Sequence, residues 1–249
     1  MQLNIINTGF NSASFNFACD EAILKWVQKT KTPVLRFYGF APTACTIGYF
    51  QGMKLELDLN FAKNNNIECV RRLTGGGAVM HDQNQFTYSL IIPENLVPTN
   101  IQESYEYICK PIMSALNQIG LNPEFAPLND IILNGQKISG NAQTRKGGVV
   151  LQHGTLLLDV DVDTMFRVLL VPDEKLRDKL VASVKKRVTG INQHLSKSID
   201  FDDLVSLFED HFVKLFSVKT INKIDLSDLE LDLEEYKLKY QSDEWNLMF

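Results

Sequence analysis

Positions 71–82 read RRLTGGGAVMHD, so two arginines lead into three consecutive glycines and a His-Asp pair closes the stretch. Glycine-rich backbone exposes N–H groups, and guanidinium groups bind anions through paired hydrogen bonds. The segment therefore predicts a phosphate or other anion site, unless it is only a strained turn with surface arginines. It lacks the GK[ST] of a P-loop, and no helix opens after it as in the dinucleotide fingerprint.

A second candidate group, Lys137, lies in the stretch NGQKISG. Asn-Gly between apolar runs predicts a tight β-hairpin just before the lysine. A strand lysine is often no more than an exposed edge residue. Here, however, Asn129 and Asp130 precede it and the small residue Gly140 follows it, which leaves room for a ligand beside the lysine.

His81 and His153 lie in apolar strand sequence, where a histidine is commonly a core residue with satisfied ring nitrogens. No Ser-His-Asp spacing and no histidine pair of metal-ligand spacing stands out. The four cysteines form no metal-binding motif either. Arginines, glycines, an Asp and a Lys without an evident nucleophile suit charge stabilisation at a phosphorus centre better than covalent catalysis.

Hydrophobic periodicity predicts the elements that must position these residues. We expect helices at 14–29 and 101–120, an edge strand in LNIIN, and further strands in PVLRFYGF, ACTIGYF, IECVRR, AVMH, FTYSLIIP and GVVLQHGTLLLDV. From about residue 160 to 249 the pattern is mainly helical, at 161–170, 173–184, 201–216 and 226–240. This order predicts an α+β fold of mixed, largely antiparallel sheets flanked by helices, in one domain spanning residues 1–249.

Composition limits the class of protein. The 249 residues carry a net charge of −5, which argues against a broad nucleic-acid surface. No apolar run approaches the length of a membrane span, and the first residues do not resemble a signal peptide. Scattered single cysteines suit a reducing compartment. We therefore expect a cytoplasmic protein that binds neither nucleic acid nor a membrane.

Three separated motifs carry a family resemblance. RRLTGGGAVMHD, NDIILNGQKISGNAQ and LQHGTLLLD resemble, in this order and spacing, the catalytic domain of the lipoate–protein ligase A family. RFYGFAPTACTIGYFQ and the terminal YQSDEWN are also similar to that family, so the resemblance covers nearly the whole chain. The superfamily includes biotin ligases and octanoyltransferases. The resemblance implies a fold like that of class II aminoacyl-tRNA synthetases and biotin ligases.

In that family, lipoate and Mg-ATP form lipoyl-AMP, and a lysine of a lipoyl domain then attacks the acyl group. The resemblance therefore implies an ATP-dependent lipoate–protein ligase with ATP, Mg²⁺ and lipoate as ligands. Lys137 would be catalytic, Arg72 would hold phosphate, and Asp130 would orient Mg²⁺ or the incoming amine. The implied binding set for ATP and lipoyl-adenylate comprises Arg72, Gly75, Gly76, Gly77, Ala78, Val79, Met80, His81, Asn129, Asp130, Lys137, Gly140 and His153.

The implied partners are lipoyl-domain proteins, namely the E2 subunits of 2-oxoacid dehydrogenases and the H protein of glycine cleavage. Many ligases of this family continue beyond EWN into a small accessory domain, whereas this sequence ends three residues later. We therefore expect the catalytic domain alone, with the accessory domain absent and a separate accessory subunit completing the enzyme.

The main alternative is an octanoyltransferase, which moves octanoate from acyl carrier protein to lipoyl domains through a cysteine thioester. That mechanism needs a thiolate in the pocket. One branch carries it upstream of the HG segment and another on a loop ahead of the lysine hairpin, yet GGVVLQHG and LNPEFAPLND contain no cysteine. Cys69 is the thiol nearest to the motifs. The missing thiol favours the ligase. A non-enzymatic acyl- or nucleotide-binding protein is the second alternative and a biotin ligase a lesser one.

Overall fold

The computed structural model describes residues 2–170 and 174–249. Its strands are β1 (Gln2–Asn11), β2 (Val34–Phe40), β3 (Ala44–Ile47), β4 (Glu68–Arg71), β5 (Val79–His81), β6 (Gln85–Pro93), β7 (Glu124–Ala126), β8 (Asp130–Leu133), β9 (Gln136–Lys146), β10 (Val149–Leu157) and β11 (Thr220–Lys223). Its α-helices are α1 (Ala13–Thr30), α2 (Met53–Glu56), α3 (Leu59–Asn64), α4 (Ile101–Gln118), α5 (Val162–Val168), α6 (Glu174–Lys185), α7 (Phe201–Leu215), α8 (Leu233–Gln241) and α9 (Asp243–Asn246). Short 3₁₀ turns are η1 (Glu94–Leu96), η2 (Ile191–His194) and η3 (Leu226–Leu229).

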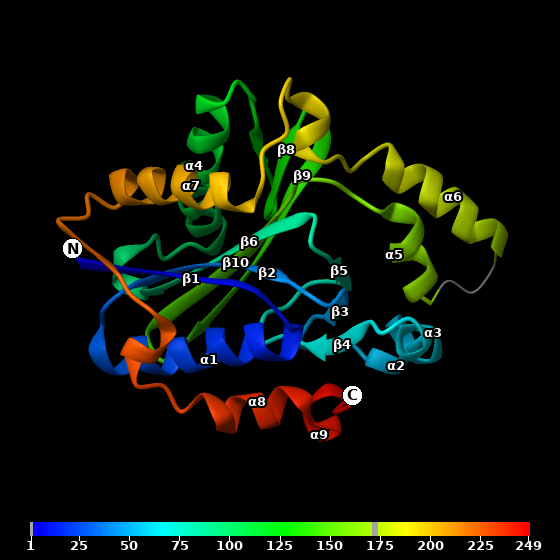
Figure 1. Ribbon diagram of the computed structural model, residues 1–249, viewed down its shortest axis with the longest axis horizontal. Coiled ribbons are helices and arrows are strands. Elements are labelled where there is room, and N and C mark those ends of the chain that lie inside the picture. Colours follow the sequence, from blue (N-terminus) through cyan, green and yellow to red (C-terminus); the bar gives the residue numbers. More distant parts are fainter. Residues whose placement is uncertain (1, 171–173) are drawn as a thin grey trace.

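Two sheets organise the chain (Figure 1). The large sheet has the strand order β11-β1-β2-β6-β10-β9-β8-β7, and the small one has the order β4-β3-β5. In the large sheet β1 pairs in parallel with β2 and β11, whereas the other pairs are antiparallel. Helices pack on both faces of the large sheet. This arrangement confirms the predicted α+β class with mixed, largely antiparallel sheets.

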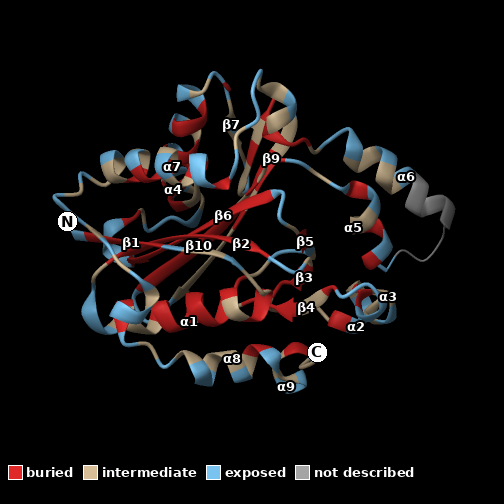
Figure 2. Cartoon of the chain, in the orientation of Figure 1, coloured by how far each residue is buried: buried red, intermediate tan, exposed pale blue. Residues whose placement is uncertain are grey.

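The helices on the two faces bury the core in different ways. α4 and α7 cover one face, while α1 lies against the other and is itself covered by α8 (Figures 1 and 2). Because α1 is enclosed from two sides, most of its residues are buried. The largest apolar cluster joins the sheet to α4 and α7 through residues such as Phe86, Ile112 and Phe208. Such a core fixes the strands whose ends form the site described below.

The predicted helices at 14–29 and 101–120 correspond to α1 and α4, and both begin at a side-chain cap of the expected type. Ser12 Oγ accepts from the N–H of Phe15, and Asn100 Oδ1 accepts from the N–H of Glu103. α4 ends just before Gly120, which has φ +87°, a conformation that glycine adopts without strain. The Asn134-Gly135 hairpin is also confirmed, with both residues at positive φ between β8 and β9.

Two predictions about the ends of the chain were wrong: the edge position of the first strand and the single helix over residues 226–240. β1 is not an edge strand, because β11 pairs with it in parallel from Gln2↔Thr220 to Ile5↔Lys223. The region after residue 160 consists mainly of helices, as predicted, and β11 is the one short strand among its described residues. The predicted helix 226–240 is divided into η3 and α8, because Asp225 and Asp228 form a capping box and Glu230 has a left-handed backbone. The start of the predicted helix at 173 lies outside the described residues.

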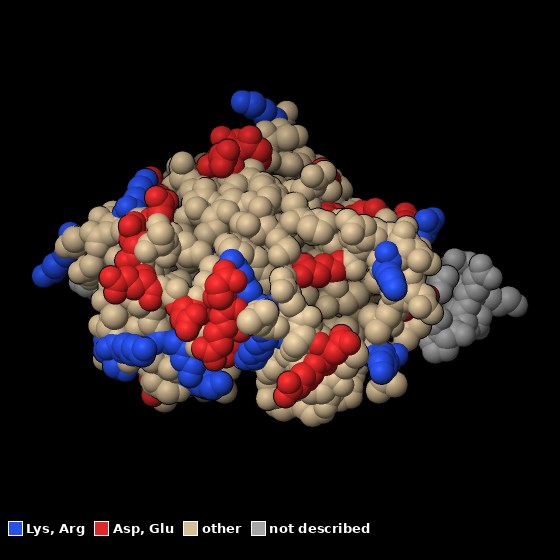
Figure 3. Space-filling model, turned by 60° about the horizontal axis from the view of Figure 1, so that its bottom comes forward, with Lys and Arg blue, Asp and Glu red and all other residues tan. Residues whose placement is uncertain are grey.

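Charges of both signs lie interspersed on the face of the molecule that includes α8 (Figure 3). Two lysines of α8 pair with acids, Lys237 with Glu234 and Lys239 with Glu21. Among the described residues, no helix has the length and apolar character needed to cross a membrane.

Candidate active site

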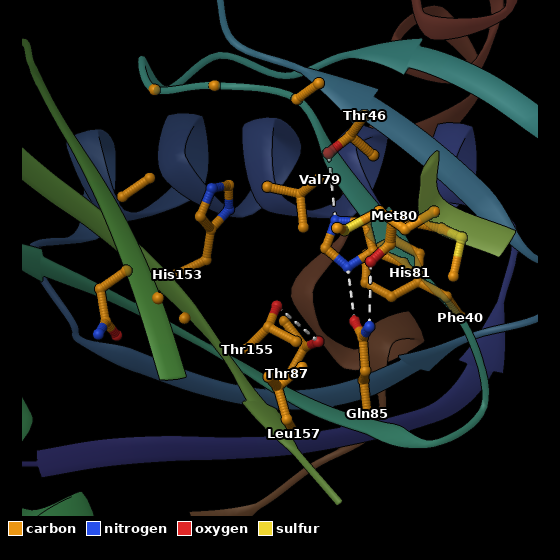
Figure 4. A pocket seen from close by; sticks show the side chains of 18 of the residues that line it. Phe40, Thr46, Val79, Met80, His81, Gln85, Thr87, His153, Thr155 and Leu157 are labelled. Atoms are coloured by element: carbon orange, nitrogen blue, oxygen red, sulfur yellow. Dashed lines mark hydrogen bonds between the residues drawn. The ribbon is translucent and has the colours of Figure 1, made fainter. Parts of the chain in front are cut away.

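A cavity of about 300 Å³ lies where the small sheet meets β9, β10 and the segment that follows β10. It is lined by twelve of the thirteen residues that the sequence analysis singled out: Arg72, Gly75, Gly76, Gly77, Ala78, Val79, Met80, His81, Asn129, Lys137, Gly140 and His153. The thirteenth, Asp130, pairs with Lys137 at its edge. The three separated motifs therefore converge on one cavity, part of which is drawn in Figure 4.

The two consecutive arginines have different positions. The Arg71 guanidinium donates to the backbone carbonyls of Tyr49, Trp245 and Asn246, so it ties α9 and the turn after β3 to the small sheet. Arg72 turns toward the cavity, where its Nη2 donates to the carbonyls of Gly75 and Gly77, both at 2.8 Å. Neighbouring side chains on a strand point to opposite faces, which explains why Arg71 and Arg72 point in different directions.

Residues 72–77 form a loop, called the glycine loop below. The Arg72 side chain holds its shape by donating to the carbonyls of Gly75 and Gly77. Its Nη1 also lies 3.3 Å from the carbonyl and hydroxyl oxygens of Thr46. Burial lowers the pKa of Arg72 to about 10, although it stays charged at neutral pH. No carboxylate among the described residues forms an ion pair with it. The sequence analysis assigned Arg72 to phosphate, whereas its donors here are directed at the loop and Thr46.

The glycines of the loop allow a backbone conformation and close contacts that a side chain would prevent. Gly76 has φ +100°, and a Cβ there would lie 2.9 Å from Arg72 Nη2. Gly48, directly after β3, approaches the loop so closely that a Cβ would collide with the carbonyl of Gly76. Beside Gly75 and Gly77 there is open space. The loop therefore lies against the strand on one side and leaves bare backbone toward the cavity on the other.

His81 is a fixed, neutral wall of the cavity. Gln85 Nε2 donates to the carbonyl of Met80, so its Oε1 accepts from His81 Nδ1–H at 3.0 Å (Figure 4). The other ring nitrogen then accepts from the Thr46 hydroxyl at 3.1 Å. Burial and the charge of Arg72 lower the pKa of His81 to about 3. The ring also stacks on Phe40, with centroids 4.1 Å apart.

His153, on β10, belongs to a buried polar network beneath the glycine loop. Its Nε2 accepts from the Thr74 hydroxyl at 2.8 Å, and its Nδ1 faces Asp20 Oδ2 at 3.4 Å. Asp20, on α1, also pairs with Arg36 at 2.9 Å. Burial acts to raise the pKa of Asp20, but the hydrogen bond from His153 and the charge of Arg36 outweigh it and hold the pKa below its usual value. The network thus connects the loop to α1 and β2.

Lys137 stands at the mouth of the cavity. Its Nζ lies 2.7 Å from Asp130 Oδ1, and the two side chains remain 40% and 32% exposed. A Cβ on Gly140 would lie 2.8 Å from Nζ, so this glycine makes the room that the lysine occupies. The N–H of Lys137 donates to the carbonyl of Arg187 and the N–H of Thr189 donates to the carbonyl of Lys137, which fixes the strand beside the end of α6. Asn129 braces β9 through Asn141.

Sequence reasoning missed several residues of this site. Thr46, Thr74 and Asp20 set the orientation of His81 and His153, but each lies far along the chain from the histidine it contacts. Gln85 lies only four residues from His81, and its contact was missed because no motif marks it. Gly48 alone carried a signal, as a glycine directly after a β-branched strand. The described residues contain no group of three or more His, Cys, Asp or Glu that could hold a metal ion. Asp130, predicted as a possible Mg²⁺ ligand, faces Lys137.

Comparison with known proteins decides the family. Residues 12–213 match the model of the lipoyl protein ligase A/B catalytic domain. The chain belongs to this family. Its curated relatives include the octanoyltransferase LipM of Bacillus subtilis, 35% identical over 97% of this chain and 96% of the relative, and LipM of Staphylococcus aureus, 33% identical over 97% of both.

Solved structures of the family share the whole fold. A bipartite lipoate protein ligase from Thermoplasma acidophilum, described with its E2 lipoyl domain, has a TM-score of 0.88 and is 29% identical, with 99% of this chain and 96% of that chain covered. A lipoate-protein ligase A bound with ATP has a TM-score of 0.82 and is 27% identical, with 99% of each chain covered.

These comparisons correct the functional prediction. The curated relatives at about one-third identity over nearly their full length are octanoyltransferases, so the ATP-dependent ligase hypothesis is wrong. The predicted ligands ATP, Mg²⁺ and lipoate are overturned with it. The ligase prediction relied on the missing pocket cysteine. The prediction that the chain is an enzyme of protein lipoylation stands at the level of the family.

Proposed function

We propose that this chain is an octanoyltransferase that moves octanoate from the thioester of an acyl carrier protein to a lysine of a lipoyl domain. The observation that carries this proposal is the full-length similarity to octanoyltransferases, together with an apolar cavity that has an amine and a carboxylate at its mouth. The acceptors would be E2 subunits of 2-oxoacid dehydrogenases and the H protein of glycine cleavage.

The interior of the cavity suits a saturated acyl chain. Phe40, Met80, Leu157, Val162 and Met165 supply apolar surface on several sides. His81 adds no charge, because its folded pKa of about 3 keeps the ring neutral at physiological pH. Burial of an eight-carbon chain against such walls stabilises the complex by about 0.8 kcal/mol for each buried methylene.

Lys137 is the group we assign to the reacting carbonyl. Its ammonium lines the cavity, and the carbonyl oxygen of a bound thioester would gain negative charge as a nucleophile attacks. A positioned donor at that oxygen stabilises the transition state more than the ground state. Asp130, 2.7 Å from Lys137, orients the ammonium and can accept a proton from the attacking amine.

The glycine loop would hold the donor near the mouth. The bare backbone of Gly75 and Gly77 leaves open space there, and Arg72 keeps the loop shape. The sequence analysis predicted a separate accessory subunit, which a ligase would need in order to activate a free acid. A donor that arrives as a thioester is already activated, so the proposal needs no such subunit. Four cysteines without a disulfide suit the reducing cytoplasm in which we place the reaction.

The test is transfer with purified components. The protein is incubated with octanoyl carrier protein and an apo lipoyl domain, and the intact mass of the lipoyl domain is followed, with Lys137→Met as the control. We expect an octanoyl mass increase on one lysine of the lipoyl domain with the wild-type protein. A parallel incubation supplies free octanoate and Mg-ATP in place of the octanoyl carrier protein. The proposal would be contradicted if the lipoyl domain were modified in that incubation and stayed unmodified with the carrier protein.

A further inference from the structure

Resting on the proposed function, we infer that this chain passes the octanoyl group directly from the carrier thioester to the acceptor lysine, without an acyl-enzyme intermediate on cysteine. The inference comes from the positions of all four cysteines of the chain, each of which the structure describes. None of them lines the cavity.

The two thiols of the small sheet point away from the cavity. Thr46 on β3 lines the cavity, and neighbouring side chains of a strand alternate in direction, so Cys45 faces the opposite side. There Cys45 packs with Ile47 and Met53 in a separate apolar cluster, against which Cys69 also packs. Burial raises the pKa of Cys45 to about 12 and that of Cys69 to about 11, which disfavours the reactive thiolate.

The remaining two thiols belong to the core. Cys109, on α4, lies in the apolar cluster between the large sheet and its covering helices. Cys19, on α1, is fully buried. Burial raises the pKa of Cys19 to about 11 and that of Cys109 to about 12. A thiol in either place could reach a bound thioester only if a packed helix moved.

The chain also lacks a long segment ahead of the lysine hairpin that could carry a nucleophile. β7 pairs with β8 at Ala126↔Asp130, so only residues 127–129 connect the two strands. The alignment with the Bacillus subtilis octanoyltransferase runs over 269 positions, more than the 249 residues of this chain, so that relative contains residues without a counterpart here. A shortened connection at β7–β8 agrees with this difference in length.

A hydroxyl does not take the place of the thiol. Thr74, His153 and Asp20 form a chain of contacts similar to a nucleophile, a base and its orienting acid. Thr74, however, is fully buried and does not line the cavity. Its carbonyl also accepts from the N–H of Tyr49. This network therefore positions the glycine loop, and the exposed polar groups at the mouth are those of Lys137 and Asp130.

The direct reaction balances without a bond to the enzyme. The acceptor amine nitrogen bonds to the thioester carbonyl carbon, and the carbon–sulfur bond breaks. Asp130 accepts a proton from the amine, and the carrier sulfur leaves and takes up that proton, so the products are an octanoyl amide and a free carrier thiol. Donor and acceptor must then occupy the site together. Sequential kinetics follow, instead of the ping-pong pattern of a covalent intermediate.

Two measurements on the full-length protein test this inference. In the first, the protein is mixed with octanoyl carrier protein alone, its intact mass is measured, and apo lipoyl domain is then added. We expect no octanoyl group on the enzyme before the acceptor arrives, and intersecting lines in initial-rate plots when both substrates are varied. An enzyme-bound octanoyl group that moves to the lipoyl domain, on Cys69, Thr74 or any other residue, would overturn the inference.

The second measurement uses Cys69→Ser, since Cys69 is the only cysteine that is not fully buried among the four. We expect transfer within about twofold of wild type, because this thiol makes no contact with the cavity. Loss of transfer in a folded Cys69→Ser protein would contradict direct transfer while leaving octanoyltransferase activity established. Absence of transfer by the wild-type protein with all three components would instead reject the proposed function, and the inference with it.

Discussion

The glycine loop, residues 72–77, and the lysine hairpin, residues 129–140, face the same cavity but use their polar groups in opposite ways. In the loop, the Arg72 guanidinium is buried and its donors are directed at carbonyls and a hydroxyl of the protein itself. In the hairpin, Lys137 and Asp130 are about one-third exposed and contact each other. One region is internally satisfied, and the other retains hydrogen-bonding capacity for a substrate.

The contrast indicates which of the two regions performs chemistry. A group whose donors are already directed at internal partners maintains a shape, because releasing it would leave those partners unpaired. The Lys137 ammonium is 40% exposed and has one partner, so it can donate to a new acceptor at little cost. We therefore assign the shape of the cavity to the loop and charge stabilisation to the hairpin. Substitutions in the two regions should therefore have different effects on transfer and on stability.

Lys137→Met should abolish most of the transfer while leaving the fold intact. Loss of one donor to a developing oxyanion typically lowers kcat by about 10²–10³-fold. The side chain is 40% exposed, so the free energy of unfolding should change little. Transfer rates and urea unfolding are measured side by side, with Lys110→Met on the exposed side of α4 as the matched control. Transfer within tenfold of wild type would remove Lys137 from the reaction.

Arg72→Met should impair both the fold and the activity. The substitution leaves the carbonyls of Gly75 and Gly77 without their donor, which typically costs about 1–3 kcal/mol of stability. We expect at least about a tenfold loss of kcat/KM, because the loop no longer has a fixed shape. Arg71→Met is the comparison, since it also loses carbonyl partners but does not line the cavity. Equal losses of activity in the two variants at matched stability would contradict the assignment.

Gly76→Ala should cost about 1–2 kcal/mol of stability, because φ is +100° and the new Cβ would approach Arg72. The matched control is Gly120→Ala at the end of α4, where φ is +87° and no atom lies nearby. Thermal unfolding should show a comparable loss for both variants. Only Gly76→Ala should raise the KM for octanoyl carrier protein. A normal KM in this variant would show that the loop does not contact the donor.

His81→Gln should change the pH dependence of stability and little else. The folded pKa of His81 is about 3, below its usual value of 6.5, so between these values the unfolded chain binds a proton that the folded chain does not. The wild-type protein therefore loses stability as pH falls below 6.5, by roughly 1.4 kcal/mol per unit from this residue. The free energy of unfolding of both proteins is measured in urea at pH 7.5 and at pH 5. The difference between wild type and His81→Gln should fall by roughly 2 kcal/mol at the lower pH. An unchanged difference would mean that His81 is not buried neutral.

The sequence predicted the cavity better than the contacts that hold it. The motifs are local, so glycines, Lys137 and both histidines could be identified from short stretches of sequence. The opposite orientations of Arg71 and Arg72 depend on strand pairing, and the Asp20–His153 contact joins residues 133 apart. β11 was missed for the same reason, since Thr220–Lys223 becomes a strand only beside β1. The prediction of a ligase depended on the absence of a single thiol. That absence does not decide whether the acyl donor is a free acid or a carrier thioester.

The most direct test is a competition between donors in one tube. Isotope-labelled octanoyl carrier protein and unlabelled octanoate with Mg-ATP are mixed in equal amounts with the protein and an apo lipoyl domain. The mass of the octanoyl group on the lipoyl domain identifies its source. We expect the labelled group on the lipoyl domain with the wild-type protein and none with Lys137→Met. Incorporation of the unlabelled group would contradict it.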